Sequence, residues 1–440
     1  MKKLIVVIIS FAMVLGTLAS SIYYLLSNTR ADPTSSDPFA DIPQAVVRSF
    51  RYSDFSDMDV SELDLSTVGD EILTYTFSSG TKWPAPEKMP PGDPPERIIS
   101  LGKDLGLGLD ALHEAGITGK GVPVAVIDKP ILEDHEAYSE NLRYIEVKPG
   151  EGGTQEPGFH GAAIASILAG DYGVAPESPL YYFAIPDDST PYKWLTEAMN
   201  MLLDMREEML EEERIRVVSV SYGIESSQVG AAEWREAIAR AEEQGVIVVY
   251  PGMPGLHFTG AGCPPNLDRD NPANYERWSW LVAKEQLVGK LVEAGVSSFD
   301  EAREELKRLL TSDPELDVLR VEAIHAFLYM IELSRLDPAA NYEEYLWSMV
   351  TYDPGALSVP VDYLTVAGAS SPSSYTYFGA GGLSWATPYL AGVLALGLQV
   401  NPSATPEELF AALLETAWTY GHEGVQGKLV NPRAFVDALR

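Results

Sequence analysis

The stretch GVPVAVID, residues 121–128, indicates how this chain folds. It is a short and continuous apolar run, which is typical of a strand buried on both faces of a sheet. The helical pattern GAAIASILAG (161–170) comes after it, and SPLYYFAIP (178–186) is the next apolar run. Buried strands that alternate with helices predict a parallel sheet that is covered by helices on both faces.

The same alternation continues along the chain. We expect a helix from about residue 193 to 214, a strand at 216–223, a helix at 231–244 and a strand at 245–252. The pattern resumes at DYLTVAGAS (362–370) and includes a helix at 384–398. A last helix is predicted to begin with a capping box formed by Thr405 and Glu408. The sequence therefore predicts an α/β fold with a doubly wound, mostly parallel sheet.

Two segments interrupt this alternation. Residues 32–97 are rich in Pro, Ser and Asp, which predicts an extended arm, with an inhibitory prosegment as the alternative. Residues from about 274 to 349 contain consecutive helical patterns, which predict a helical insertion. The remaining α/β pattern predicts one large domain over residues 98–440, and the helical insertion lies within it.

The N-terminal sequence predicts export. Lys2 and Lys3 precede an apolar run over residues 4–26, and a polar stretch follows this run. Basic residues before an apolar run are typical of a signal peptide or of an N-terminal membrane anchor, here over residues 1–31. A spanning helix needs about 20 apolar residues, so residues 4–26 are long enough for an anchor. In both cases we expect the rest of the protein outside the cytoplasm, either secreted or anchored on the outer face of the membrane.

The composition argues against several kinds of partner. The chain has 440 residues, with 31 Lys and Arg against 64 Asp and Glu, which gives a formal net charge of −33. Such an acidic surface repels phosphate backbones, so we expect no nucleic-acid partner. With Cys263 as the single cysteine, the chain has no disulfide framework and no cysteine-based zinc site. No loop has the spacing of calcium ligands, and we expect no metal and no cofactor.

Three polar residues lie where predicted elements begin or end. Asp128 ends a strand, His160 directly precedes the helix that starts at Gly161, and Ser384 opens the helix in GLSWATPYLAG (382–392). Each has a structural explanation, because Asp caps turns, His often only hydrogen-bonds, and Ser is a frequent helix N-cap. Together they are the residue types that nucleophilic catalysis by a serine requires. Ser is the nucleophile, His is the general base, and Asp orients the base.

These motifs resemble those of the subtilisin-like (subtilase) serine peptidases. GKGVPVAVID resembles the Asp motif of that family, HGAAIASILAG its His motif and GLSWATPYLAG its Ser motif, in the same chain order. The resemblance covers about residues 101–439 apart from the insertion. It implies a subtilisin-like fold, a polypeptide substrate cleaved through an acyl-enzyme, and a catalytic triad of Asp128, His160 and Ser384. It further implies that an edge segment, formed by Ser221, Tyr222 and Gly223, pairs with the substrate backbone. The alternative is that these three residues are an ordinary strand end.

The flanks of the three motifs depart from the family pattern. Where the family usually has other residues, this chain has Lys129, Pro130, Ala162, Ala163, Leu383 and Trp385. None of these changes removes a group of the triad that transfers protons.

The largest departure concerns the oxyanion hole. The family usually has Gly-Asn after the strand that corresponds to GVIVV, and the Asn side chain donates to the oxyanion. This chain has Met253 there, and a thioether cannot donate a hydrogen bond. His257 and Asn266, in the loop that follows, are candidates to replace this donor.

Two functions from different classes remain. The first is an active serine endopeptidase, which the complete Asp, His and Ser set favours. The second is a catalytically weak relative that binds peptides or proteins, which the missing Asn favours. An α/β-hydrolase is excluded by chain order, because its serine precedes its acid and its histidine.

Overall fold

The computed structural model describes residues 49–148, 156–187, 190–224, 228–314, 316–334, 344, 346–347, 350, 353, 355–422 and 425–440. The predicted signal peptide or anchor, with its apolar run over residues 4–26, lies outside the described residues, as does the first part of the predicted arm. The chain divides into two compact units. The first contains residues 1–77, 81–92 and 278–353, and the second contains residues 78–80, 93–277 and 354–440.

The described residues of the second unit include a five-stranded parallel sheet. Its strands, in spatial order, are β3 (Leu142–Glu146), β4 (Leu180–Ala184), β2 (Val124–Asp128), β5 (Val217–Ser219) and β6 (Ile247–Val249). Every residue of β2, β4, β5 and β6 is buried, whereas the edge strand β3 is partly exposed. The structure thus confirms that the apolar runs are strands buried on both faces.

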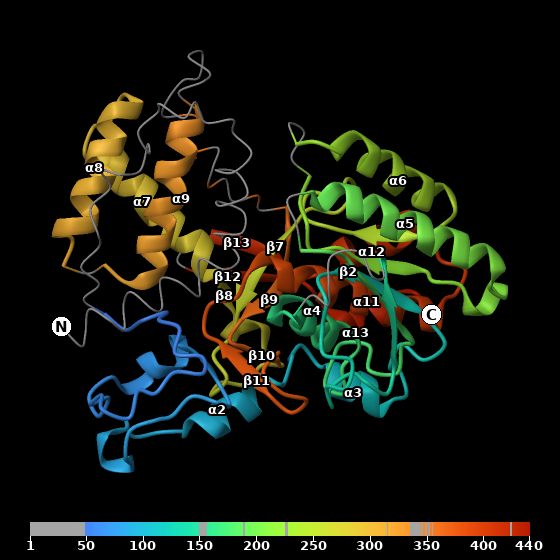
Figure 1. Ribbon diagram of the computed structural model, residues 1–440, viewed down its shortest axis with the longest axis horizontal. Coiled ribbons are helices and arrows are strands. Elements are labelled where there is room, and N and C mark those ends of the chain that lie inside the picture. Colours follow the sequence, from blue (N-terminus) through green and yellow to red (C-terminus); the bar gives the residue numbers. More distant parts are fainter. Residues whose placement is uncertain are drawn as a thin grey trace. The chain divides into compact units, whose positions relative to one another are not determined.

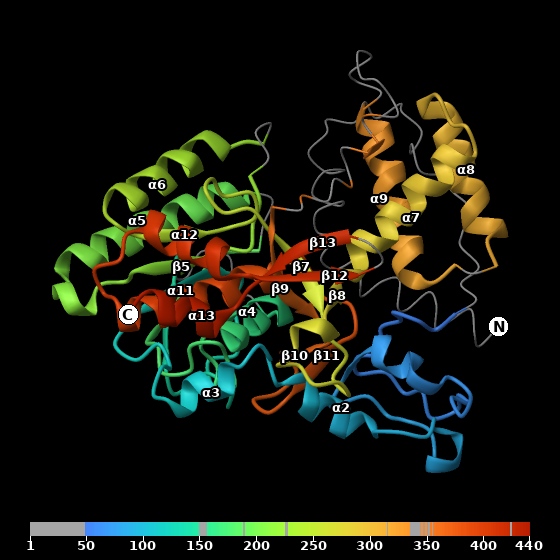
Figure 2. The same cartoon turned by 180° about the vertical axis from the view of Figure 1, so that it is seen from behind.

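Helices cover both faces of this sheet (Figures 1 and 2). The helices α4 (Phe159–Ala169) and α11 (Ala386–Val400) contact each other on one face, and α5 (Pro191–Glu208) and α6 (Ala231–Glu243) contact each other on the other face. The doubly wound α/β architecture predicted from the sequence is therefore present.

The helix α11 is an interior helix. Within the described part of the chain, one helical stretch, Leu383–Val400, has the length and composition to cross a membrane, and 78% of it is buried in the protein. It packs against the parallel sheet and against α4. Its apolar character is therefore explained by burial in the core.

The remaining strands of the second unit form other sheets. One has the order β12 (Trp418–His422), β13 (Val425–Leu429), β9 (Leu357–Asp362), β7 (Phe258–Gly262) and β8 (Glu276–Arg277). The stretch DYLTVAGAS, expected to resume the α/β pattern, contains β10 (Leu364–Ala367), which pairs antiparallel with β11 (Tyr375–Phe378). The loop between them is too short for the crossover that a parallel pair requires.

Short helices complete the second unit. They are α2 (Pro95–Gly102), α3 (Leu109–Glu114), η3 (Glu211–Glu213), η4 (Pro272–Asn274), η5 (Leu383–Trp385), α12 (Pro406–Thr416) and α13 (Pro432–Ala438). The predicted capping box at the start of α12 is confirmed. The backbone N–H of Thr405 donates to Glu408 Oε2 at 2.9 Å, and the N–H of Glu408 donates to Thr405 Oγ1 at 3.2 Å.

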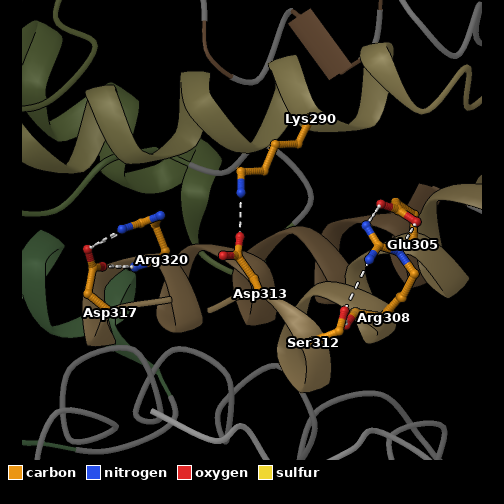
Figure 3. A network of polar contacts seen from close by, with 7 residues as sticks. All are labelled: Lys290, Glu305, Arg308, Ser312, Asp313, Asp317 and Arg320. Carbon is orange, nitrogen blue, oxygen red and sulfur yellow. Dashed lines mark hydrogen bonds and ion pairs between the residues drawn. The ribbon is translucent and has the colours of Figure 1, made fainter. Parts of the chain in front are cut away.

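The first unit contains the predicted helical segment. The helices α7 (Ser279–Glu293), α8 (Phe299–Ser312) and α9 (Val318–Ser334) pack on one another around an apolar core of their own, which includes Leu287, Leu306 and Phe327. One ion pair links two of these helices, and another is local to the start of α9 (Figure 3). Lys290 of α7 pairs with Asp313 at the end of α8, and Arg320 of α9 pairs with Asp317 at 2.8 Å.

The described part of the arm has a regular internal structure. Phe55, Val60 and Leu65 are buried, and their backbone N–H groups donate to the carbonyls of Thr76, Lys82 and Lys88 at 2.8, 2.9 and 2.8 Å. Each buried residue lies between an Asp and a Ser, and each Asp accepts a hydrogen bond from the backbone of that Ser. The segment also contains η1 (Gly69–Thr74), β1 (Thr76–Ser78) and η2 (Pro86–Lys88). The sequence analysis missed this five-residue repeat of Asp-x-Ser.

Candidate active site

Asp128 and His160 are in direct contact. Asp128 is the last residue of β2 and is fully buried, and His160 is the second residue of α4. Nδ1 of His160 lies 3.0 Å from Oδ1 of Asp128, which also accepts the backbone N–H of Lys129 at 2.7 Å. Oδ2 is 3.0 Å from the same Nδ1 and has no separate hydrogen-bond partner among the described residues. A carboxylate bound to Nδ1 holds the imidazole in the orientation in which Nε2 can act as a base.

The atoms around Gly161, the residue after His160, leave no room for a side chain. A Cβ atom at Gly161 would lie 1.9 Å from the Tyr182 hydroxyl and 2.7 Å from the carbonyl oxygen of Lys129. Tyr182 is fully buried on β4, and its hydroxyl donates to that same carbonyl. The absence of a side chain at Gly161 therefore lets the start of α4 approach the strand ends, and this brings His160 to Asp128.

Ser384 lies in η5, directly before α11. Neither η5 nor α11 is capped by a side chain, so the alternative that Ser384 is a helix N-cap is wrong. Gly381 shapes the turn, because a Cβ atom there would lie 1.8 Å from the carbonyl oxygen of Val361. The N–H of Gly381 donates to the buried carboxylate of Asp362 at 2.8 Å, which holds this turn on β9.

The turn of Ser384 lies beside His160. The ring of Trp385, the next residue, is 5.7 Å from the imidazole ring, measured between centroids. No hydrogen bond joins the Ser384 hydroxyl to His160 among the described residues. A hydrogen bond between a nucleophile and its base is often loose before substrate binds. The backbone N–H of Ser384 donates to no backbone carbonyl in the described part of the chain, so it is available to an oxyanion.

Aromatic side chains surround His160, and the sequence analysis missed them. Phe159 lies 6.4 Å from the imidazole and 6.1 Å from Phe378, and Phe378 lies 5.5 Å from Trp385, all measured between ring centroids. The sequence contained one indication of this aromatic cluster. An aromatic residue is adjacent to each of the two candidate residues: Phe159 precedes His160, and Trp385 follows Ser384.

The predicted edge segment begins two residues after the end of β5. The backbone N–H groups of Ser221, Tyr222 and Gly223 donate to no backbone carbonyl of the described residues, so a peptide strand could pair with them. The Tyr192 hydroxyl donates to the carbonyl of Gly223 at 2.8 Å. Burial, together with the negative charges of Asp128 and Asp187, raises the pKa of Tyr222, so this phenol stays neutral.

Met253 and the two candidate oxyanion donors, His257 and Asn266, lie in and after the turn that follows β6. Met253 is buried and closes a turn in which its N–H donates to the carbonyl of Tyr250 at 3.1 Å. Gly252 has φ +84°, the left-handed conformation that such a Pro-Gly turn requires. His257 and Asn266 are exposed. The roles of His257 and Asn266 stay predictions.

Other reactive groups of the described residues do not form a second site. No group of three or more His, Cys, Asp or Glu side chains in this part of the chain could hold a metal ion. Cys263 is fully buried, and burial raises the pKa of its thiol to about 11. A buried thiol with a raised pKa is a poor nucleophile.

Comparison with known proteins shows a similarity to the subtilase family over part of the chain. The model of the Subtilase family matches residues 119–283, which include Asp128, His160 and the edge segment. Subtilisin Savinase of Lederbergia lenta is 26% identical over 332 residues, which are 74% of this chain and 94% of that protein. M-protease of Shouchella clausii (strain KSM-K16) is also 26% identical over 332 residues, and the match spans 66% of its length. Among solved structures, the prenylagaramide maturation protease PagA matches 76% of this chain and 98% of its own, with 16% identity and a TM-score of 0.44.

A doubly wound sheet with an Asp–His pair at its strand ends, beside a serine that opens an interior helix, is an arrangement suited to serine hydrolases. Together with the family match and the relatives, it supports a divergent member of the subtilase family. The family and its protease relatives support a serine peptidase, at low sequence identity.

Proposed function

We propose that this protein is a serine endopeptidase that uses Asp128, His160 and Ser384 as its catalytic triad. The observation that carries the proposal is the hydrogen bond of 3.0 Å between His160 Nδ1 and the fully buried carboxylate of Asp128. A buried aspartate that is bonded to a histidine stabilises the imidazolium that forms during acyl transfer. The turn of Ser384 lies on the same side of the sheet edge, next to the histidine.

In this proposal the reaction has two steps. Ser384 Oγ bonds to the substrate carbonyl carbon while its proton passes to His160 Nε2, and the Ser384 N–H stabilises the oxyanion. His160 then gives this proton to the leaving amine, which leaves an acyl-enzyme. A water molecule, deprotonated by the same histidine, releases the acid and regenerates Ser384.

The proposed substrate is an extended polypeptide outside the cytoplasm. Among the described residues, the backbone N–H groups of Ser221, Tyr222 and Gly223 donate to no backbone carbonyl, which supports pairing with a peptide backbone and favours extended chains of varied sequence. Export is supported by Lys2, Lys3 and the apolar run over residues 4–26.

Labelling with a fluorophosphonate tests the activated serine. We expect the wild-type chain to be labelled at Ser384, and both Ser384→Ala and His160→Ala to abolish labelling and peptide cleavage. The double variant should be no slower than either single variant, because triad members act as a unit. Ser403→Ala is the matched control, because Ser403 is exposed and its hydroxyl bonds only to Asn401.

A second candidate function is peptide binding without turnover. The buried Met253 favours it, because no side-chain donor stands where the family usually has Asn. The same experiment separates the two functions. A wild-type chain that binds peptides but takes up no fluorophosphonate would contradict the peptidase and support the binding protein.

A further inference from the structure

The hydroxyl of Ser221 contacts the backbone of the proposed nucleophile. Ser221 Oγ donates to the carbonyl oxygen of Ser384 at 3.0 Å, although the two residues lie 163 positions apart in the chain. Pairing with a substrate would use only the backbone of Ser221. Its side chain therefore has a separate role.

The carbonyl of Ser384 lacks the partner that a helix usually supplies. In an α-helix the carbonyl of residue i accepts from the N–H of residue i+4. For Ser384 this residue is Pro388, in the first turn of α11, and proline has no N–H. A partly buried carbonyl without a donor is costly, and the hydroxyl of Ser221 supplies that donor.

We propose that Ser221 is a positioning residue for Ser384. Its hydroxyl replaces the hydrogen bond that Pro388 cannot make, and so fixes the turn that carries the Ser384 hydroxyl. The bond from Gly381 to Asp362 holds the same turn three residues earlier. The inference rests on the proposed function, because positioning matters only if Ser384 attacks. Reaction rates are sensitive to small displacements of a nucleophile.

Three variants test the role of this hydroxyl. We expect Ser221→Ala to lower kcat and the single-turnover acylation rate about tenfold, as the loss of one hydrogen bond would. KM should not change, because the backbone of the edge segment is kept. Ser221→Thr should retain the rate, since it keeps the hydroxyl. Ser219→Ala is the matched control, because Ser219 lies two positions before Ser221, at the end of β5, and its buried hydroxyl has no partner among the described residues.

A double-mutant cycle with Pro388→Ala is the decisive experiment. That substitution restores an N–H four residues after Ser384, so Ser221→Ala should cost much less in the Pro388→Ala background than in the wild-type background. Equal losses in the two backgrounds would overturn the inference. So would a Ser221→Ala variant that acylates at the wild-type rate.

The same cycle, followed by thermal unfolding, tests the hydrogen bond without any activity. Ser221→Ala should lower the unfolding midpoint, and Pro388→Ala should reduce that loss. If the wild-type serine takes up no fluorophosphonate, the proposed function fails, whatever the unfolding cycle shows. If it is labelled and the two losses in rate are equal, only the positioning role of Ser221 fails.

Discussion

Two adjacent glycines precede Ser384, and the structure gives them different surroundings. A Cβ atom at Gly381 would lie 1.8 Å from the carbonyl oxygen of Val361 and 2.7 Å from Trp385. At Gly382 the nearest atom to a Cβ would be the Ser384 nitrogen, at 3.8 Å. The first glycine is therefore a steric requirement of the turn, and the second is not.

This difference predicts opposite results for neighbouring substitutions. Gly381→Ala should destabilise the protein by about 1–3 kcal/mol, as overpacking of a core does, and should displace Ser384. Gly382→Ala should unfold at the wild-type temperature. Thermal unfolding of both variants checks the prediction, and equal midpoints would show that the close approach at Gly381 does not constrain the turn.

At the scale of elements, the arm and the helix α9 of the first unit interact electrostatically through two acidic side chains, Asp54 and Glu322. Burial and, to a smaller extent, the negative charge of Asp54 in the arm raise the pKa of Glu322 on α9 to about 8. Burial also raises the pKa of Asp54 itself. Both carboxyl groups are therefore protonated more readily in the folded protein than in the unfolded chain.

The raised pKa of Glu322 predicts that stability falls as pH increases. Between pH 4.5, the ordinary pKa of a glutamate, and about pH 8, the folded state binds more protons than the unfolded state. The contribution of Glu322 to the free energy of unfolding is therefore complete below pH 4.5 and is lost as the pH rises from 4.5 to about 8. Glu322→Gln, which stays neutral, should flatten the dependence and raise stability at pH 8. Unfolding midpoints from pH 4.5 to 9 measure this. Glu304→Gln on the exposed side of α8 is the control, and identical pH profiles for the two variants would refute the assignment.

At the scale of the whole molecule, the helical segment is inserted in the chain between two strands of one sheet of the second unit. Residues 278–353 follow β8 and precede β9, and both strands pair with β7. The two ends of the segment are thus close together, a geometry that tolerates long insertions. This explains how the chain can carry a bundle with its own apolar core without interrupting the second unit.

Export is the remaining expectation at this scale. In intact cells that express the full chain, added protease should digest residues 98–440, because we expect the apolar run over residues 4–26 to direct them across the membrane. A variant that lacks residues 2–26 should stay protected until the cells are lysed. Equal protection of both chains would contradict the export interpretation.

The sequence by itself determined the elements and the residues at their ends. Apolar runs and helical periodicity are local patterns, so they predicted the parallel strands, the helices that cover them, and the places of Asp128 and His160. The same local patterns placed Ser384 at the start of a helix, and the family motifs then implied a triad of the three residues. The Asp-x-Ser repeat was also visible in the sequence, but its meaning depends on the second segment that accepts its hydrogen bonds.

Only the tertiary structure decided which of these elements meet. The antiparallel pairing of β10, the aromatic cluster around His160 and the contact of Ser221 with Ser384 all join groups from different elements. The role of Pro388 became visible only with that contact, because a missing donor matters when the carbonyl it would serve is partly buried. Such contacts depend on how distant parts of the chain approach one another, and no local pattern of residues records that approach.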